Sequence, residues 1–246
     1  MKVVRTRRGA RLVQGGAVLS EILARPGPTD TLFDLLATLV ARLAPGPRVG
    51  LLGFAGGGVV APIRALGFGG PLEAVDLSLE AVPLFKELSR TWCGRVRVHK
   101  QEACSWLRGQ PRFDLLLEDL SIEGPEGETK PPATWTRLPR LMRRRLGTRG
   151  IAIVNLLPVP GMSWSLLTEA VSAPFEDCLV VELTDYENRV LVLGGELPAA
   201  RELGRDLRDR LRGLGSDQAD KVRVRQGRSP RQRSGSRGGK KGRSAR

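Results

Sequence analysis

The chain has 246 residues, of which 41% are apolar, and a net charge of +14. This is enough apolar sequence for one sizeable α/β core with a small appendage. The chain has no run of about 18 apolar residues and no apolar segment behind its basic N-terminus, so we expect neither a membrane span nor a secretory signal, and a cytoplasmic protein.

The cysteines and the histidine give little basis for disulfide or metal chemistry. Cys93, Cys104 and Cys178 are three in number and widely spaced, which is typical of reduced thiols that fill a core. The single histidine, His99, excludes an ordinary His-rich metal site. We therefore expect no metal.

Residues 1–28 predict an N-terminal β piece. Residues 3–24 alternate enough to form two or three short strands, and Gly15-Gly16 stands where a hairpin turn would fall. A Pro-Gly-Pro sequence at 26–28 ends this piece.

A helix then opens a larger domain, residues 29–214. Thr29 or Asp30 can cap this helix, which runs to Leu43 with apolar residues at helical spacing. A second Pro-Gly-Pro sequence, at 45–47, stops it.

A glycine-rich turn between two apolar strands is the most informative stretch of the chain. Val49–Leu52 predicts a buried strand, residues 53–58 the turn, residues 59–66 a helix, and residues 72–75 a second strand that ends on Asp76. This order is typical of nucleoside sites, where backbone N–H groups approach the ligand and the acid accepts hydrogen bonds from ribose. The alternative is a plain tight connection. No Gly-Lys-Ser/Thr follows the turn, which argues against NTP hydrolysis.

The remaining elements alternate between helices and short apolar strands. We predict helices over 78–92, 105–107, 134–146, 163–173 and 198–214, and strands over 96–98, 113–117, 150–156, 179–183 and 189–193. A polar Pro/Gly-rich loop covers 120–133. This order predicts an α/β fold, a doubly wound, mostly parallel sheet with an antiparallel C-terminal edge.

Three acidic residues end or follow successive strands. Asp76, Glu102 and Asp119 should therefore converge at one edge of the sheet. Carboxylates gathered in this way indicate a cationic or hydrogen-bonding ligand. The alternative is that each is a solvated residue at a strand end.

These same stretches resemble the spermidine synthase family, whose members share the Rossmann-like fold of S-adenosylmethionine-dependent methyltransferases. The resemblance covers about residues 3–195 and is carried by LLGFAGGGVVAPIRALG, LEAVDLSLEAV, VRVHKQEACSWL and FDLLLEDLSIEGP. It implies that Asp76 holds the ribose, that Glu102 receives the adenine amino group and that Asp119 is catalytic. It also implies a nucleoside-binding glycine turn, whose members are Gly53, Gly56, Gly57 and Gly58.

The chain departs from the family on the polyamine side. Gly56 stands where the family has an acid for the amino-alkyl end of decarboxylated S-adenosylmethionine, and Ile122 stands where it has a second aspartate. Leu19 and Phe33 replace a glutamine and a tyrosine. The resemblance thus implies an intact nucleoside site and a degenerate polyamine site, which Ile122→Asp with Gly56→Asp would partly restore.

The last segment, residues 215–246, is a basic tail. From Ser216 onward it carries eleven Lys or Arg and two Asp, and it has no aromatic residue. We expect it to be disordered, and its removal after Leu214 to leave the fold intact. Its charge indicates RNA or an acidic partner; a solubilising tail is the alternative.

Two functions follow as hypotheses. The first is a transferase that binds S-adenosylmethionine or its decarboxylated form and carries out methyl transfer or a divergent aminopropyl transfer. The second is a non-catalytic relative that binds nucleic acid or an acidic partner through the tail, Arg137, Arg140 and the run 143–145. A homodimer is a candidate assembly.

Overall fold

A computed structural model describes residues 2–14, 17–124 and 127–227 of the chain. Its N-terminal piece is a three-stranded antiparallel sheet of β1 (Lys2–Thr6), β2 (Gly9–Gln14) and β3 (Ala17–Leu23), as expected. The predicted turn at Gly15-Gly16 lies outside the described residues. Leu12 and Ile22 are buried and attach this sheet to the main core.

The main body is an eight-stranded sheet in the order β13-β11-β12-β10-β7-β4-β5-β6. Its strands are β4 (Val49–Leu52), β5 (Leu72–Asp76), β6 (Val96–Lys100), β7 (Phe113–Glu118), β10 (Leu146–Leu156), β11 (Asp177–Leu183), β12 (Arg189–Gly194) and β13 (Val222–Gln226). Strands β6, β5, β4, β7 and β10 are parallel, whereas β12, β11 and β13 form an antiparallel edge. The predicted fold class is confirmed.

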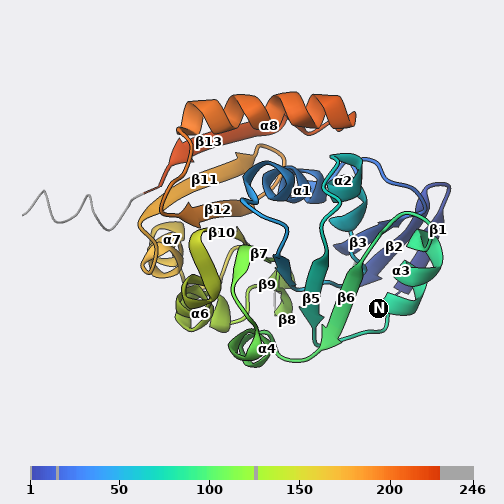
Figure 1. Ribbon diagram of the computed structural model, residues 1–246, viewed down its shortest axis with the longest axis horizontal. Coiled ribbons are helices and arrows are strands. Elements are labelled where there is room, and N and C mark those ends of the chain that lie inside the picture. Colours follow the sequence, from blue (N-terminus) through green and yellow to red (C-terminus); the bar gives the residue numbers. More distant parts are fainter. Residues whose placement is uncertain (1, 15–16, 125–126, 228–246) are drawn as a thin grey trace, which may run out of the picture.

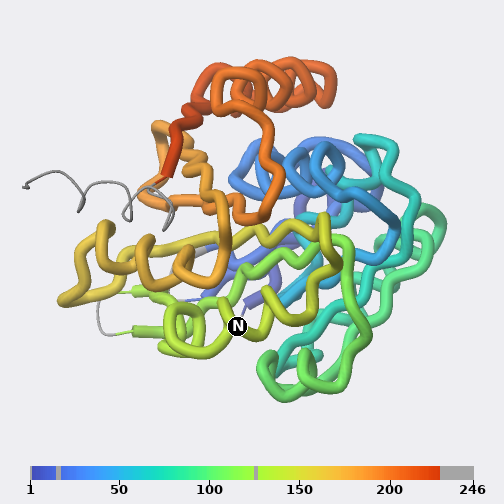
Figure 2. Tube along the Cα trace, turned by 60° about the vertical axis from the view of Figure 1, so that its left-hand side comes forward, coloured from blue at the N-terminus to red at the C-terminus, as the bar shows by residue number. Residues whose placement is uncertain are grey.

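Helices cover both faces of this sheet (Figures 1 and 2). They are α1 (Leu32–Leu43), α2 (Val60–Ala65), α3 (Val82–Ser89), α4 (Ala103–Gly109), α5 (Ala133–Thr136), α6 (Leu138–Arg145), α7 (Trp164–Ser172) and α8 (Ala200–Leu214). One core contains buried residues of α1, α2, α3 and α8, and the other contains those of α4, α6 and α7. Among the helices that the structure describes, none has the length and apolar character needed to cross a membrane.

Several element boundaries differ from the predictions for local reasons. The cap of α1 is Thr31, whose hydroxyl accepts a hydrogen bond from Phe33 N, because Thr29 instead donates to Asp34. The predicted helix over 78–92 is shorter, and α3 runs from Val82 to Ser89. The predicted helix over 134–146 is two helices, α5 and α6, and the predicted loop over 120–133 contains a hairpin of β8 (Ile122–Gly124) and β9 (Gly127–Thr129).

The start of the predicted basic tail is structured. A 3-10 turn (Ala219–Lys221) follows α8, and β13 then pairs with β11. The prediction of disorder from residue 215 is therefore wrong over 216–227, because the alternation of VRVRQ was missed and Val222 is buried. Residues 228–246 lie outside the described part of the chain.

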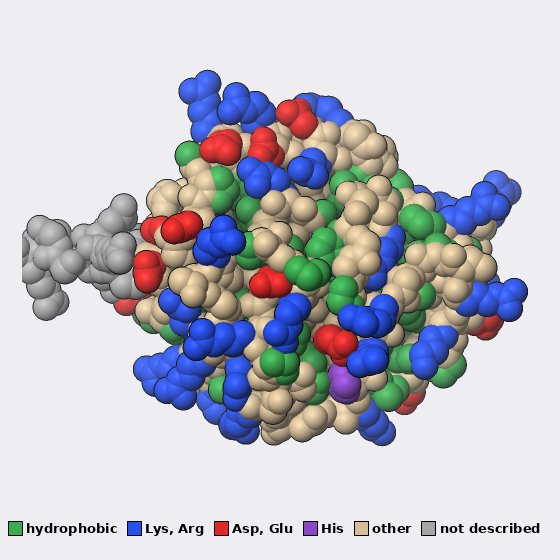
Figure 3. Space-filling view, viewed as in Figure 1, with side chains coloured by type: hydrophobic (Ala, Val, Ile, Leu, Met, Phe, Trp, Pro, Cys, Tyr) green, Lys and Arg blue, Asp and Glu red, His purple; other side chains and the backbone are tan. Residues whose placement is uncertain are grey.

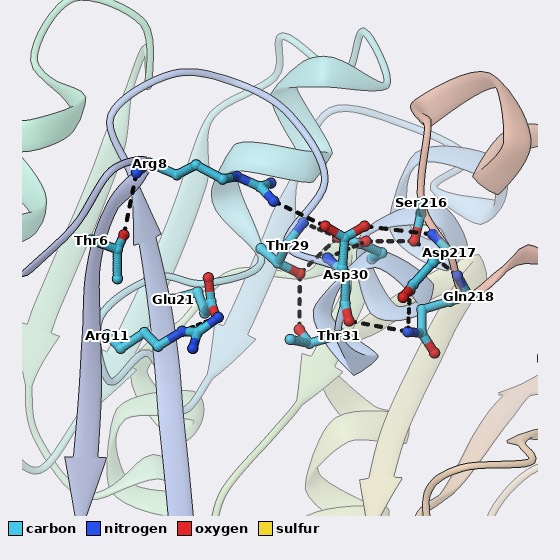
Figure 4. Close-up of polar contacts among 11 residues, drawn as sticks. Thr6, Arg8, Arg11, Glu21, Thr29, Asp30, Thr31, Ser216, Asp217 and Gln218 are labelled. Carbon is cyan, nitrogen blue, oxygen red and sulfur yellow. Dashed lines mark hydrogen bonds and ion pairs between the residues drawn. The ribbon is translucent and has the colours of Figure 1, made fainter. Parts of the chain in front are cut away.

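A polar network joins this C-terminal segment to the start of α1 (Figure 4). Ser216 Oγ donates to Asp34 Oδ2 at 2.6 Å, and Gln218 Nε2 donates to the Asp30 carbonyl at 3.0 Å. Asp34 is fully buried, and its carboxylate also accepts from the backbone and hydroxyl of Thr29. The segment after α8 thus satisfies a buried charge in the main domain.

Candidate functional site

A cavity of about 870 Å³ lies at the carboxyl ends of β4, β5 and β7. The strand order reverses here, since β4 pairs with β5 on one side and with β7 on the other. Open α/β sheets bind ligands at such a switch point. The N-terminal sheet and the start of α1 form the opposite wall of the cavity.

Asp76 lines this cavity and fixes the glycine turn. Its Oδ2 accepts hydrogen bonds from Phe54 N at 2.7 Å and Ala55 N at 2.8 Å, and its Oδ1 accepts from Ser78 N at 2.9 Å. A carboxylate has about four acceptor positions, so Asp76 can still accept from a ligand. The side chain therefore shapes the turn as well as facing the cavity.

The predicted glycines occupy two different environments. Gly53 lines the cavity with φ +92°, and a Cβ there would lie 2.5 Å from the Asp119 carbonyl oxygen. Gly56, Gly57 and Gly58 are buried and do not line the cavity.

These three glycines make room for neighbouring side chains. A Cβ at Gly56 would lie 2.7 Å from Leu12 Cδ1 in the N-terminal sheet, and Gly58 N donates to Ser20 Oγ at 2.9 Å. A Cβ at Gly57 would meet the ring of Phe54. Their small size allows the N-terminal sheet and nearby rings to pack closely against the turn.

Glu102 is the N-cap of α4 and does not line the cavity. Its carboxylate accepts from Cys104 N at 2.9 Å and from Ser105 N at 2.8 Å. Burial raises the pKa of this carboxyl, but the hydrogen bonds from Cys104 and Ser105 outweigh it and hold the pKa at about 2. Asp76 and Asp119 line the cavity and Glu102 does not, although Gln101, the residue before Glu102, donates to the Asp76 carbonyl at 3.0 Å.

Asp119 faces the cavity at the end of β7. Its Oδ1 accepts from Asn155 Nδ2 at 2.7 Å, and Asn155 Oδ1 accepts from Asn188 Nδ2 at 3.0 Å. Sequence reasoning missed both asparagines. The one signal was a polar Asn155 at the end of an apolar strand, IAIVNL.

A buried ion pair supports the segment that carries Asp119. Lys130 Nζ lies 3.1 Å from Glu118 Oε1, and both side chains are almost fully buried. Lys130 also donates to the Leu120 carbonyl, and Thr134 donates to Glu118 at 2.9 Å. Burial raises the pKa of Glu118, and Lys130 opposes that shift. The pair fixes the chain on both sides of Asp119.

The hairpin of β8 and β9 brings Glu128 to the cavity. Ser121 Oγ donates to its Oε1 at 3.2 Å. Burial and the nearby Asp119 raise the pKa of Glu128, whereas Ser121 and Lys130 lower it. Ile122, in contrast, is 42% exposed and does not line the cavity.

The cavity is strongly acidic although the protein is basic. The carboxylates that line it are those of Glu21, Asp76, Glu80, Asp119 and Glu128. Among the lining residues that the structure describes, the one cationic side chain is Arg11, whose Nε lies 2.5 Å from Glu21 Oε1. Leu19 and Phe33 also line the cavity. Within the described ranges, no group of His, Cys, Asp or Glu side chains could hold a metal ion.

The sheet order, the antiparallel edge and the switch-point cavity define the fold of S-adenosylmethionine-dependent methyltransferases and spermidine synthases. The resemblance inferred from the sequence is confirmed at the level of the fold. No protein-family model and no curated protein sequence matches the chain.

Several solved structures are similar to this chain. A probable spermidine synthase from Corynebacterium glutamicum ATCC 13032 matches with a TM-score of 0.69 and 14% identity, over 99% of this chain and 92% of that chain. A spermidine synthase in complex with the transition-state analogue AdoDATO matches with a TM-score of 0.59 and 15% identity, over 89% and 79%. Human methyltransferase-like protein 13, in complex with SAH, matches with a TM-score of 0.55 and 18% identity, over 75% and 90%. At these identities the likeness establishes the fold.

Proposed function

We propose that the protein is a transferase that binds an S-adenosylmethionine-type nucleoside in the acidic cavity and transfers an alkyl group from its sulfonium to a cationic amine. The observation that supports this most is the charge of the cavity, where five carboxylates face one paired guanidinium in a protein of net charge +14. A sulfonium and an ammonium are both cations. An acidic cavity lowers the electrostatic free energy of holding them together.

The nucleoside would lie between the glycine turn and the end of β5. Asp76 would accept hydrogen bonds from the ribose hydroxyls, beside Gly53, which also lines the cavity. Leu77 follows Asp76, lines the cavity and is 68% exposed, which offers apolar surface to a base. A volume of about 870 Å³ falls within the usual range for such sites, about 300–1,000 Å³.

Asp119 would act as the general base. When bound, the co-substrate supplies an electrophilic carbon and a neutral thioether as the leaving group. The Asp119 carboxylate takes a proton from the ammonium, the freed lone pair attacks the carbon, and the C–S bond breaks. Asn155 holds one carboxylate oxygen and leaves Oδ2 for this proton. Such general-base assistance contributes about 10²–10⁴ in rate.

Glu128 would supply the second carboxylate. The position at which the resemblance places a second aspartate is Ile122, outside the cavity. Glu128 lies on the same hairpin and faces the cavity near Asp119. The polyamine side of the site would thus be rearranged, with a charge-assisted bond from Glu128 to the acceptor.

The pair of Arg11 and Glu21 supports ordinary S-adenosylmethionine over the decarboxylated form. The methionine end of that ligand carries an ammonium and a carboxylate, which an Arg–Glu pair complements. The decarboxylated form has no carboxylate for Arg11, and the place of the family's loop acid, Gly56, is filled by Leu12. We therefore propose methyl transfer, with aminopropyl transfer as the second candidate.

Calorimetric titration with S-adenosylmethionine, its decarboxylated form and methylthioadenosine tests this proposal. We expect S-adenosylmethionine to bind at least about tenfold more tightly than the decarboxylated form. Arg11→Met should remove this preference and leave methylthioadenosine binding unchanged. Tighter binding of the decarboxylated form would favour aminopropyl transfer. Absence of binding by all three ligands would contradict the proposed function and favour a non-catalytic role.

A further inference from the structure

A group of arginines, which we call the arginine surface, lies at the amino-terminal ends of the parallel strands, opposite the cavity. Its members are Arg108, Arg112, Arg140, Arg144, Arg145 and Arg149. Arg112 directly precedes β7 and Arg145 directly precedes β10, and the next residues, Phe113 and Leu146, are register partners. The cavity lies at the other ends of these two strands. The two sites are therefore separated by the length of the sheet.

Packing of α4 against α6 assembles this surface. Leu138 and Met142 turn one face of α6 into the core, so its arginines lie toward solvent. The Arg145 guanidinium donates to the carbonyl of Arg108 at the end of α4 and joins the two helices. Arg145 is half-buried and the other five members are exposed.

No member of the arginine surface forms an ion pair with a carboxylate in the described part of the chain. Helix α6 has four arginines and no acid, LPRLMRRR. Helix α8 has five arginines interleaved with three acids, of which Asp206 and Asp209 pair with Arg42 and Arg212.

Figure 3 shows Lys and Arg side chains gathered over the part of the molecule where α6 lies, with no acidic side chain among them on this face. Neighbouring like charges destabilise a free surface unless an anion neutralises them. This surface is therefore suited to a polyanion.

We propose that the arginine surface binds the phosphate backbone of a nucleic acid. Arginine stays charged at every relevant pH and its planar guanidinium pairs with phosphate through two parallel hydrogen bonds. An anionic membrane fits less well, because the exposed large apolar side chains of the described chain lie outside α4 and α6. Phosphate contacts bind without reading sequence. The proposal does not depend on the function of the cavity.

Two triple variants of the full chain test this proposal. Arg140→Gln, Arg144→Gln and Arg149→Gln together remove three exposed members of the surface. Arg201→Gln, Arg205→Gln and Arg210→Gln together remove three exposed arginines of α8 that are also without an ion pair among the described residues, and so give the same loss of charge. Binding is measured with a single-stranded RNA of 20 nucleotides over a series of salt concentrations, and with polyglutamate and phosphatidylserine vesicles as competitors.

We expect the surface triple to lose at least about tenfold in RNA affinity and its salt dependence to flatten by about 2–3 in slope, because three phosphate contacts are removed. The α8 triple should stay within about twofold of the parent. Replacement of the same three surface residues by lysine should retain most of the salt slope. Equal losses in the two glutamine triples, no RNA binding by the parent, or tighter binding of the parent to vesicles or polyglutamate than to RNA would each overturn the proposal.

Discussion

The cavity lies at the carboxyl ends of the parallel strands and the arginine surface at their amino-terminal ends, and the two regions carry opposite charge. The cavity gathers five carboxylates from four separate segments, whereas the arginine surface has six guanidinium groups from α4, α6, β10 and the residue before β7. The net charge of +14 matches only the second region. Net charge therefore describes the outer surface of this protein and says nothing of the ligand in its cavity.

Asp119→Asn should give the largest functional change and separate the two regions. An amide cannot take the ammonium proton, so we expect the transfer rate to fall about 10²–10⁴-fold. Binding of RNA by the arginine surface should not change, since Asp119 lies at the opposite edge of the sheet. Single-turnover rates and RNA titrations on the same preparation measure both effects. A rate within about threefold of the parent would remove Asp119 from the mechanism.

Truncation tests the segment after α8, which is hydrogen-bonded to the start of α1 at the cavity wall. A chain that ends at Leu214 loses β13 and the Ser216 hydrogen bond to buried Asp34, so we expect a loss of about 3–5 kcal/mol in unfolding free energy. A chain that ends at Gly227 keeps both and serves as the matched control. Denaturant titration distinguishes them, and equal stability of the two truncated chains would mean that β13 is dispensable.

Gly56→Asp tests where the glycine turn faces. The sequence resemblance implied that this change would help restore amine use. Because a Cβ at Gly56 would lie 2.7 Å from Leu12, we expect overpacking and a loss of about 1–3 kcal/mol in stability, with no gain of aminopropyl transfer. Gly69→Asp is the control, since an added Cβ there meets no atom within 4 Å. Gain of spermidine formation by Gly56→Asp would show that the turn opens toward the cavity.

Substitution of Glu128 should have the smallest effect, and it should change how acceptor binding depends on pH. Its raised pKa means that it keeps its proton to higher pH than an ordinary glutamate, so a cationic acceptor binds better as the pH rises through that pKa. The free energy of unfolding depends on pH with the opposite sign. The stabilisation that Glu128 gains from its raised folded-state pKa is fully present below the unfolded pKa and is lost as the pH rises through the folded pKa.

Glu128→Gln should flatten the pH dependence of KM for the acceptor and raise KM up to about tenfold. Glu123→Gln, on the same hairpin but outside the cavity lining, should behave as the parent. Identical pH profiles for the parent and Glu128→Gln would exclude Glu128 from acceptor binding.

The sequence predicted the sheet and the positions of Asp76 and Asp119 because these follow from the order of strands and turns along the chain. Strand, turn and strand at 49–76 fix where Asp76 lies, and the carboxyl end of β7 fixes Asp119. The predicted adenine contact of Glu102 stays a prediction; the structure adds that its carboxylate caps α4, a role that a residue following a strand can take.

The remaining site residues come from long-range contacts that no local pattern reveals. Asn155 reaches Asp119 from the neighbouring strand β10, and the β8–β9 hairpin, within a predicted loop, places Lys130 against Glu118. The glycines 56–58 follow a familiar pattern, but their role depends on Leu12 and Ser20, which belong to a separate sheet.

A crystal structure of the protein with S-adenosylhomocysteine is the decisive measurement for the proposed nucleoside site. We expect the nucleoside in the acidic cavity, with its ribose hydroxyls within hydrogen-bonding distance of Asp76 and its sulfur facing Asp119. An empty cavity at saturating ligand concentration, or a nucleoside bound away from Asp76, would contradict this proposal.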